Sequence, residues 1–175
     1  MKKYLSFLLF FMVVIPVCAD DMKLILHDKC INALYMPASA YFMYDGIYVI
    51  RDSRGIILRF NLKSPSDEYL SITTGTLEKL QKIKSFLAKI KNPVIIEVHI
   101  QEKFYNNAVN LKNWEISAVI AGNIEKTMTD GNDDLKNRVH SVGYGEFLPA
   151  KNTPNNGGNF LNRIDIIILC NVSGE

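Results

Sequence analysis

The sequence predicts an α+β fold, a two-layer sandwich in which helices cover one face of a mixed four-stranded sheet. Three observations support this prediction. Residues 47–62 form two β-rich runs around a short turn, two later segments carry apolar residues at helical spacing, and 94–100 and 163–169 are short runs rich in isoleucine. A chain of 175 residues with 48% hydrophobic residues is long enough for one core and too short for two, so we expect one domain.

The first β-rich segment, 47–62, predicts a hairpin. Its two runs flank Asp-Ser-Arg-Gly at 52–55, which favours a short turn. After the turn, apolar side chains at Ile56, Leu58 and Phe60 alternate with more polar ones. Because successive side chains of a strand point to opposite faces, we expect one face to be buried and the other partly wet.

Two segments predict amphipathic helices. In 76–91 the apolar residues recur three and four positions apart, and we expect Thr76 to cap this helix. The segment 113–128 predicts the second helix, with Asn113 as its N-cap. The apolar side of the second helix is formed by Ile116, Ile120, Ala121, Ile124 and Met128.

The remaining segments predict three strands and two loops. The run 94–100 is almost continuously apolar, which is typical of a central strand covered on both faces. The polar loop 101–112 follows it, in a position where sheets of this kind place ligands. We expect a short strand over 138–146, a polar loop over 148–159 and the last strand over 163–169.

The N-terminus predicts an export signal. Residues 1–17 place Lys2 and Lys3 before an apolar run, and a membrane-spanning helix would need about 20 apolar residues, more than this run offers. Residues 18–45 show no clear period, and we interpret them as a tether or extension that packs on the domain or on a partner. The domain itself is expected over 46–172.

Two processing routes remain open. Cleavage before Cys18 would free a thiol for lipid attachment, whereas cleavage after Ala19 would give a soluble periplasmic protein. We favour lipidation at Cys18, because a cysteine at the end of an apolar run is uncommon by chance. The protein is then expected on the periplasmic side of the outer membrane.

The charge balance excludes two classes of partner. The chain has 20 basic and 18 acidic residues, so removing Lys2 and Lys3 leaves a net charge near zero. Nucleic-acid binding needs a basic surface that replaces phosphate counterions, and docking on anionic lipid needs a polybasic cluster. We expect neither partner.

Cys30 and Cys170 form an even pair in an oxidising compartment. They could form a disulfide that joins the N-terminal extension to the last strand, or they could be two buried free thiols. The sequence leaves both alternatives open.

Four motifs, in order, carry a family resemblance. They are VIIEVHI at 94–100, NWEISAVIA at 113–121, VGYGEFLP at 142–149 and RIDI at 163–166. Over about 120 residues the chain resembles the OmpA C-terminal-like domain of OmpA, MotB and Pal proteins, a peptidoglycan-associated module. The resemblance implies the α+β fold described above.

The resemblance also implies a degenerate binding site. In that family an aspartate at the strand end and an arginine in the helix hold the two charges of diaminopimelate, and a guanidinium suits a carboxylate because it donates two parallel hydrogen bonds. Here Gln101 stands at the aspartate position and Ile120 at the arginine position. Peptidoglycan binding is therefore expected to be weak or lost. The candidate site for peptidoglycan or a protein partner comprises His99, Gln101, Asn113, Ser117, Ile120 and Arg163.

Metal and enzyme chemistry are not expected. His27, His99 and His140 have no ligand-type spacing and no cluster of cysteines or carboxylates beside them in the sequence, so we interpret His99 as a hydrogen-bonded strand-end residue. Neither Cys30 nor Cys170 lies in a nucleophile turn. We therefore expect no catalytic residue and no cofactor.

The expected function is a non-enzymatic scaffold subunit of a cell-envelope complex, attached to the outer membrane. The resemblance suggests a lipoprotein of a type IV secretion core complex, with other protein subunits as its partners. The alternative is a peptidoglycan-binding anchor that uses a modified pocket at Gln101, Asn113, Ser117 and Arg163.

Overall fold

The computed structural model describes residues 19–63, 70–102, 111–148 and 160–170, and the side chains from residue 23 onward. The predicted signal peptide and Cys18 lie outside the described residues. The elements, in chain order, are α1 (Ala19–Tyr41), β1 (Tyr48–Asp52), β2 (Gly55–Asn61), α2 (Thr74–Leu87), β3 (Val94–Ile100), α3 (Asn113–Thr129), α4 (Asp133–Lys136), β4 (Val139–Gly145) and β5 (Asn162–Leu169).

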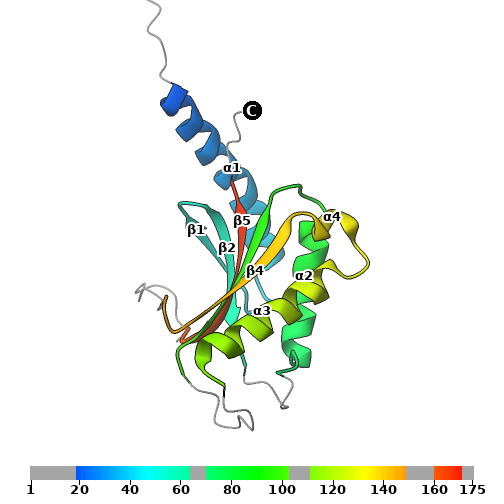
Figure 1. Ribbon diagram of the computed structural model, residues 1–175. Coiled ribbons are helices and arrows are strands. Elements are labelled where there is room, and N and C mark those ends of the chain that lie inside the picture. The colour runs from blue at the N-terminus through cyan, green and yellow to red at the C-terminus, as the bar shows by residue number, and fades with distance from the viewer. Residues whose placement is uncertain (1–18, 64–69, 103–110, 149–159, 171–175) are drawn as a thin grey trace, which may run out of the picture.

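The strands form one mixed sheet in the order β1-β2-β5-β3-β4 (Figure 1). The β3–β4 pair is parallel, and the β1–β2, β2–β5 and β3–β5 pairs are antiparallel. The α+β two-layer prediction is confirmed, but the sheet has five strands rather than four. The difference arises because both runs of the hairpin join the same sheet as the three later strands.

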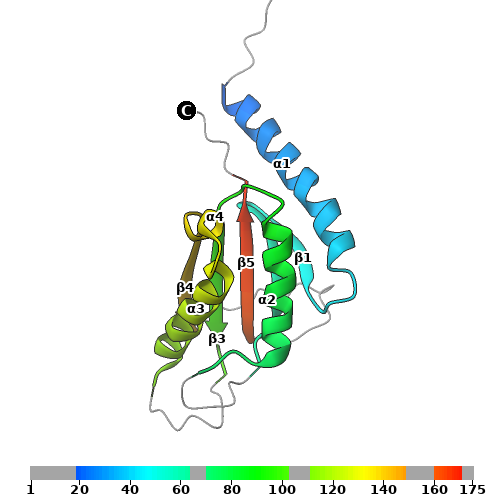
Figure 2. The same cartoon turned by 90° about the vertical axis from the view of Figure 1, so that its right-hand side faces the viewer.

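The helices lie against one face of this sheet and share a core with it (Figure 2). Ile56, Leu58 and Phe60 of β2 are fully buried there, as their alternation predicts. The apolar sides of α2 and α3 close the core, and β3 and β5 contribute Ile96 and Ile166 from the middle of the sheet. One face of the sheet is therefore closed by packed hydrocarbon.

The two predicted helix caps are wrong. The helix α2 begins at Thr74, two residues before the predicted cap. Thr76 is buried, and its hydroxyl accepts a hydrogen bond from the Thr73 hydroxyl over 3.1 Å. The N-cap of α3 is Lys112, whose backbone N–H donates to the Glu115 carboxylate over 2.7 Å. Asn113 is the first residue of α3, which leaves its side chain available for other contacts.

The extension before the hairpin is the helix α1. It is 23 residues long, and Leu34, Ala38 and Phe42, at or just after its C-terminal end, are buried in the core. Phe42 also packs against Phe86 of α2, with ring centroids 5.3 Å apart. Across the described residues, no helix is both long and apolar enough to cross a membrane.

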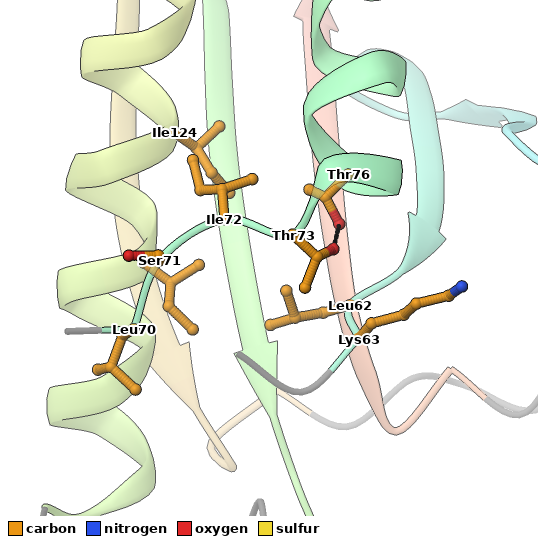
Figure 3. Close-up of a pocket in the computed structure, with 9 residues that line it drawn as sticks. Leu62, Lys63, Leu70, Ser71, Ile72, Thr73, Thr76 and Ile124 are labelled. Atoms are coloured by element: carbon orange, nitrogen blue, oxygen red, sulfur yellow. Dashed lines mark hydrogen bonds between the residues drawn. The ribbon is translucent and has the colours of Figure 1, made fainter. Parts of the chain in front are cut away.

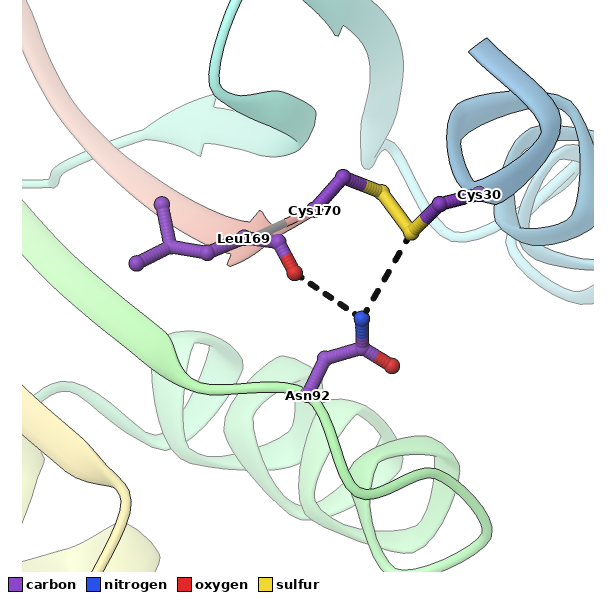
Figure 4. The surroundings of a disulfide bond; sticks show 4 residues. All are labelled: Cys30, Asn92, Leu169 and Cys170. Atoms are coloured by element: carbon purple, nitrogen blue, oxygen red, sulfur yellow. Dashed lines mark hydrogen bonds between the residues drawn. A yellow bond between two sulfur atoms is a disulfide. The ribbon is translucent and has the colours of Figure 1, made fainter. Parts of the chain in front are cut away.

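A disulfide fastens α1 to the end of β5. Cys30 and Cys170 are bonded, with 5.8 Å between their Cα atoms (Figure 4). Asn92 supports the junction, because its side-chain amide donates to the Leu169 carbonyl over 2.8 Å and lies 3.7 Å from the Cys30 sulfur. In the chain-entropy model, a bond across 140 residues contributes about 5 kcal/mol by restricting the unfolded chain.

Candidate functional site

The end of β3 and the start of α3 bring together two of the predicted site residues. The Asn113 side-chain amide lies 3.5 Å from the Gln101 carbonyl oxygen, to which it donates. Asn162 fixes the strand end, because its side-chain oxygen accepts from the backbone N–H groups of Gln101 and Glu102 over 2.9 and 3.0 Å.

Two polar atoms at this junction have no hydrogen-bond partner among the described residues. They are the Gln101 Nε2 donor and the Asn113 Oδ1 acceptor, and both are buried. An unsatisfied buried polar group costs roughly 1–3 kcal/mol. A free donor and a free acceptor at one junction can bind a neutral amide, but they carry no formal charge with which to bind a zwitterion.

Ser117 has a structural role. Its hydroxyl donates to the Trp114 carbonyl and accepts from the Gly145 N–H, each over 2.9 Å, and the residue is fully buried. The close approach of α3 to β4 requires Gly143, because a Cβ there would lie 2.2 Å from the Ala118 backbone nitrogen. Ser117 therefore joins α3 to β4.

Ile120 lies in the core, with 2% of its surface exposed. It lines a small cavity together with Leu62, Leu70 and Ile72, from the segments that flank the β2–α2 connection (Figure 3). The volume of this cavity that a water molecule can reach is about 10 Å³, enough for about one water molecule. No peptide stem fits this space.

Leu70, which lines this cavity, has an unusual backbone conformation. Its φ is +54°, in the left-handed region that a leucine rarely occupies, yet its side chain is only 2% exposed. Such a conformation costs of order 1 kcal/mol and persists where packing compensates for it. The packing of the connection before α2 thus holds Leu70 against the cavity that Ile120 also lines.

His99 and Arg163 lie on the opposite face of the sheet, within a buried network of charges. The two residues are register partners on β3 and β5. The Asp165 carboxylate accepts two hydrogen bonds from Arg59, over 2.7 and 2.8 Å, and a third from Arg163 over 3.0 Å. The side chains of His99, Arg163 and Asp165 are at most 4% exposed.

Arg163 is therefore engaged within the protein. Besides Asp165, its guanidinium donates to the carbonyl oxygens of Leu148 and Phe160 over 3.0 and 3.5 Å. Burial lowers the pKa of Arg163, and the charge of Asp165 opposes that shift. This residue fixes the start of β5 and is not free to bind a ligand.

Arg54 extends this network across the sheet. Its guanidinium donates to Glu97 over 2.7 Å and to Asp52 over 2.9 Å. Because β5 lies between β2 and β3, the Arg54 side chain passes over β5 on the face that carries Ile167, which is fully buried. Burial would raise the pKa of Glu97, but the nearby His99 ring and the hydrogen bond and charge of Arg54 outweigh this and hold the pKa below its usual value.

For His99, which we expected to be hydrogen-bonded, the described residues supply no hydrogen-bond partner at ordinary distance. Both ring nitrogens are buried without a hydrogen-bond partner in the described part of the chain, although the ring stacks on Tyr144 at 5.3 Å between centroids. Nε2 lies 3.5 Å from a Glu97 oxygen and 3.7 Å from an Asp165 oxygen. These distances exceed those of hydrogen bonds.

The expectation that no carboxylates gather near a histidine is wrong. Ligand atoms of Glu97, His99 and Asp165 lie within 4.8 Å of one another, a spacing that a metal ion could bridge. The surrounding charges disfavour a cation, since Arg54, Arg59 and Arg163 already balance Glu97, Asp165 and the partly exposed Asp52. The cluster is better described as an internal salt-bridge network that links three strands and the β1–β2 turn.

The six candidate residues therefore separate into three groups. Gln101 and Asn113 meet at the β3–α3 junction, while Ser117 and Ile120 belong to the packing of α3. His99 and Arg163 belong to the network on the other face. Sequence reasoning missed the other members of that network, although one signal was present: Glu97 and Asp165 are single acidic residues within otherwise apolar strands.

Comparison with known proteins yields structural likeness alone. No family model and no curated protein matches the chain. A MotB-like protein from Desulfovibrio vulgaris has a TM-score of 0.66 at 22% identity, covering 83% of this chain and 96% of that one. The cell wall anchor of the T6SS from Pseudomonas aeruginosa has a TM-score of 0.58 at 17% identity, covering 75% and 95%.

A third solved structure supports the same assignment. The periplasmic domain of Helicobacter pylori MotB has a TM-score of 0.55 at 17% identity, covering 71% of this chain and 82% of that one. None of these three proteins is described as an enzyme. The described strands and helices thus give this chain a fold of the OmpA/MotB/Pal type.

Proposed function

We propose that this protein is a non-enzymatic structural component of the cell envelope, a scaffold subunit that holds its place through protein partners. The observation that supports this most directly is the position of Ile120. It is buried and lines a small cavity with Leu62 and Leu70, at the position matched to an arginine of the resembled family.

The physical argument concerns the charges of the family ligand. A zwitterion taken out of water needs an opposite charge for each of its groups. Gln101 offers an amide in place of one charge, and Ile120 offers hydrocarbon in place of the other. Each lost charge pair costs a few kcal/mol, so affinity for a diaminopimelate stem should fall by several orders of magnitude.

Calorimetry tests this proposal. A diaminopimelate-containing stem peptide titrated into the protein should give no saturable heat. A matched variant, Gln101→Asp with Ile120→Arg, restores both charges and should bind more tightly than the parent chain if it folds. Tight saturable binding by the unaltered chain would overturn the proposal.

We also propose that the mature protein starts at Cys18, carries lipid there and faces the periplasm from the outer membrane, with 46–172 as the OmpA-like domain. Mass spectrometry of the mature N-terminus tests this directly. A lipid-modified Cys18 is expected, whereas an N-terminus at Asp20 would show that the protein is processed as a soluble one.

The host complex is proposed from the resemblance: an envelope machine, with a type IV secretion core complex as the first choice. Affinity purification of the tagged protein from solubilised membranes should return stoichiometric subunits. Recovery of the tagged protein alone under gentle solubilisation would contradict the scaffold role.

A second candidate function rests on the unpaired atoms at the β3–α3 junction. Gln101 Nε2 and Asn113 Oδ1 could hold a neutral amide of peptidoglycan, giving an anchor with altered contacts. Co-sedimentation with purified sacculi separates the two functions. If this second function holds, the protein should pellet, and Gln101→Ala with Asn113→Ala should abolish pelleting; with the scaffold function, no pelleting is expected.

A further inference from the structure

The helix α1 is apolar on two sides. The side that packs on the domain includes Leu34 and Ala38. A second row recurs at alternating spacings of three and four on the opposite side and comprises Leu26, Lys29, Ala33, Met36, Ala40 and Met43. We call this row the outer stripe. Its residues are all exposed, and Met43 follows the end of the helix at Tyr41.

The outer stripe is large for an uncovered surface. Leu26, Met36 and Met43 are 46%, 66% and 63% exposed, and Ile25 and Tyr44 beside them are 51% and 93% exposed. Taking about 200 Å² for a fully accessible large residue, these five expose roughly 600 Å². This area is as large as that of the largest exposed apolar patches on ordinary monomers, and such patches commonly mark interaction sites.

We propose that the outer stripe is an antiparallel pairing surface for α1 of a second copy of this chain. The spacing of three and four is the pattern with which two helices pack knobs into holes. The stripe is also symmetric about a point between residues 34 and 35. A two-fold axis at that point sets Ala33 against Met36 of the second copy, Lys29 against Ala40, and Leu26 against Met43.

Side-chain sizes fit this register. Met36 projects onto the small Ala33 of the second copy, and the aliphatic stem of Lys29 covers the small Ala40, with its ammonium free to reach water. The stripe residues Leu26, Met36 and Met43 together with the flanking Ile25 and Tyr44 expose roughly 600 Å² on each copy, so full burial of both patches would cover about 1,200 Å², above the ~1,000 Å² at which specific interfaces begin. The pair thus gives a two-fold interface of modest size.

The rest of the fold leaves this surface accessible. Because α1 docks through its other side and is bonded to Cys170 through Cys30, each copy presents a stripe held in one orientation. The N-terminal part of α1 also projects beyond the sheet (Figure 2). In an antiparallel pair the two domains would lie on opposite sides of the helix pair.

A protein surface suits this stripe better than lipid. Lys29 lies within the stripe, and the segment 19–30 contains three aspartates against two lysines, with no basic cluster to attract anionic lipid. The proposal is independent of lipidation at Cys18 and of peptidoglycan binding.

Cross-linking in the envelope tests the register. Two copies with different tags, one carrying Ala33→Cys and the other Met36→Cys, should form a mixed disulfide dimer, identified by peptide mapping that also confirms the native Cys30–Cys170 bond. Ala33→Cys paired with itself should cross-link less, because the antiparallel register displaces those two positions. Preferential self-linking of Ala33→Cys, or no mixed dimer, would overturn the antiparallel pair.

Sedimentation velocity tests the surface itself. The purified protein should dimerise at micromolar concentration, and Met36→Glu should weaken dimerisation at least tenfold. The matched control is Phe147→Glu, which places a charge at an exposed apolar residue elsewhere and should leave dimerisation unchanged. A monomer at all concentrations, with or without binding of the stripe to phosphatidylethanolamine vesicles, would overturn the proposal.

Discussion

The two faces of the sheet are covered by different kinds of side chains and interactions. The face toward the helices is sealed by hydrocarbon, including Ile120 and Leu70, whereas the opposite face carries a salt-bridge network centred on Glu97 and Asp165. No described helix covers the second face, yet Ile167 on it is fully buried. Arginine side chains that lie along the sheet supply part of the cover that a helix layer would otherwise give.

This difference shows where the charged residues of the fold are used. Ile120, on the helix-covered face, is aliphatic, while three arginines on the other face are paired with carboxylates within the protein. Charges that are paired internally stabilise the sheet but offer little to a ligand. Substitutions on either face should therefore lower the stability of the fold strongly, without changing binding to a peptidoglycan stem.

The largest effect is expected on the charged face. Asp165→Ala would leave the buried guanidiniums of Arg59 and Arg163 without their carboxylate, and removing one partner of a buried ion pair costs about 3–5 kcal/mol. Urea unfolding followed by circular dichroism measures the loss.

The matched control is Asp134→Ala. That carboxylate also has two basic partners, Lys91 and Arg138, but it is exposed to solvent. Its removal should leave the unfolding midpoint almost unchanged. Equal losses for the two variants would refute the structural importance of the network.

On the hydrocarbon face, Ile120→Ala should cost about 2–4 kcal/mol, because it enlarges the existing cavity beside Leu70. Ile95→Ala, at a half-buried position on the other face, should cost less. Urea midpoints compare the two directly. If Ile120→Ala were neutral, the position would be an open pocket and the seal by Leu70 would be disproved.

A smaller effect is expected where α3 meets β4. Ser117→Ala leaves the buried Gly145 N–H without its acceptor, which should cost about 1–3 kcal/mol. Ser85→Ala removes an exposed hydroxyl that donates to the Gln81 carbonyl and should change little. Loss of partner or sacculus binding in Ser117→Ala, without loss of stability, would instead assign this hydroxyl to a binding surface.

The sequence predicts the helix-covered face better than the charged one. The alternation of Ile56, Leu58 and Phe60 identifies their buried side because it depends on neighbours two positions apart. The pair Arg59–Asp165 joins residues 106 positions apart, so no local pattern could reveal it. The apolar run 94–100 predicts that both faces of β3 are buried, but it does not predict that the salt-bridge network covers one of them.

The same reasoning applies to α1 and to the candidate site. The extension shows no clear period because apolar residues occupy two sides of the helix. The meeting of Gln101 and Asn113 follows from their places at a strand end and a helix start, and motif order could predict it. Arg163 and Asp165 lie two positions apart on β5 and share a face, so their contact is local, whereas the contact of Arg59 with Asp165 depends on which strands become neighbours.

The smallest expected effect is a change in how stability depends on pH under acidic conditions. The pKa of Glu97 in the folded protein is lowered below the ordinary value of about 4.5, so its charged form stabilises the fold at neutral pH. That contribution is present above about pH 4.5 and is lost as the pH falls through the folded pKa. Glu97→Gln removes this titration and should therefore flatten the acid side of a plot of urea midpoint against pH, with the two chains converging in stability as the pH falls below the folded pKa. Parallel curves for the two chains would show that Glu97 titrates alike in the folded and unfolded states and that Arg54 and His99 do not hold its charge.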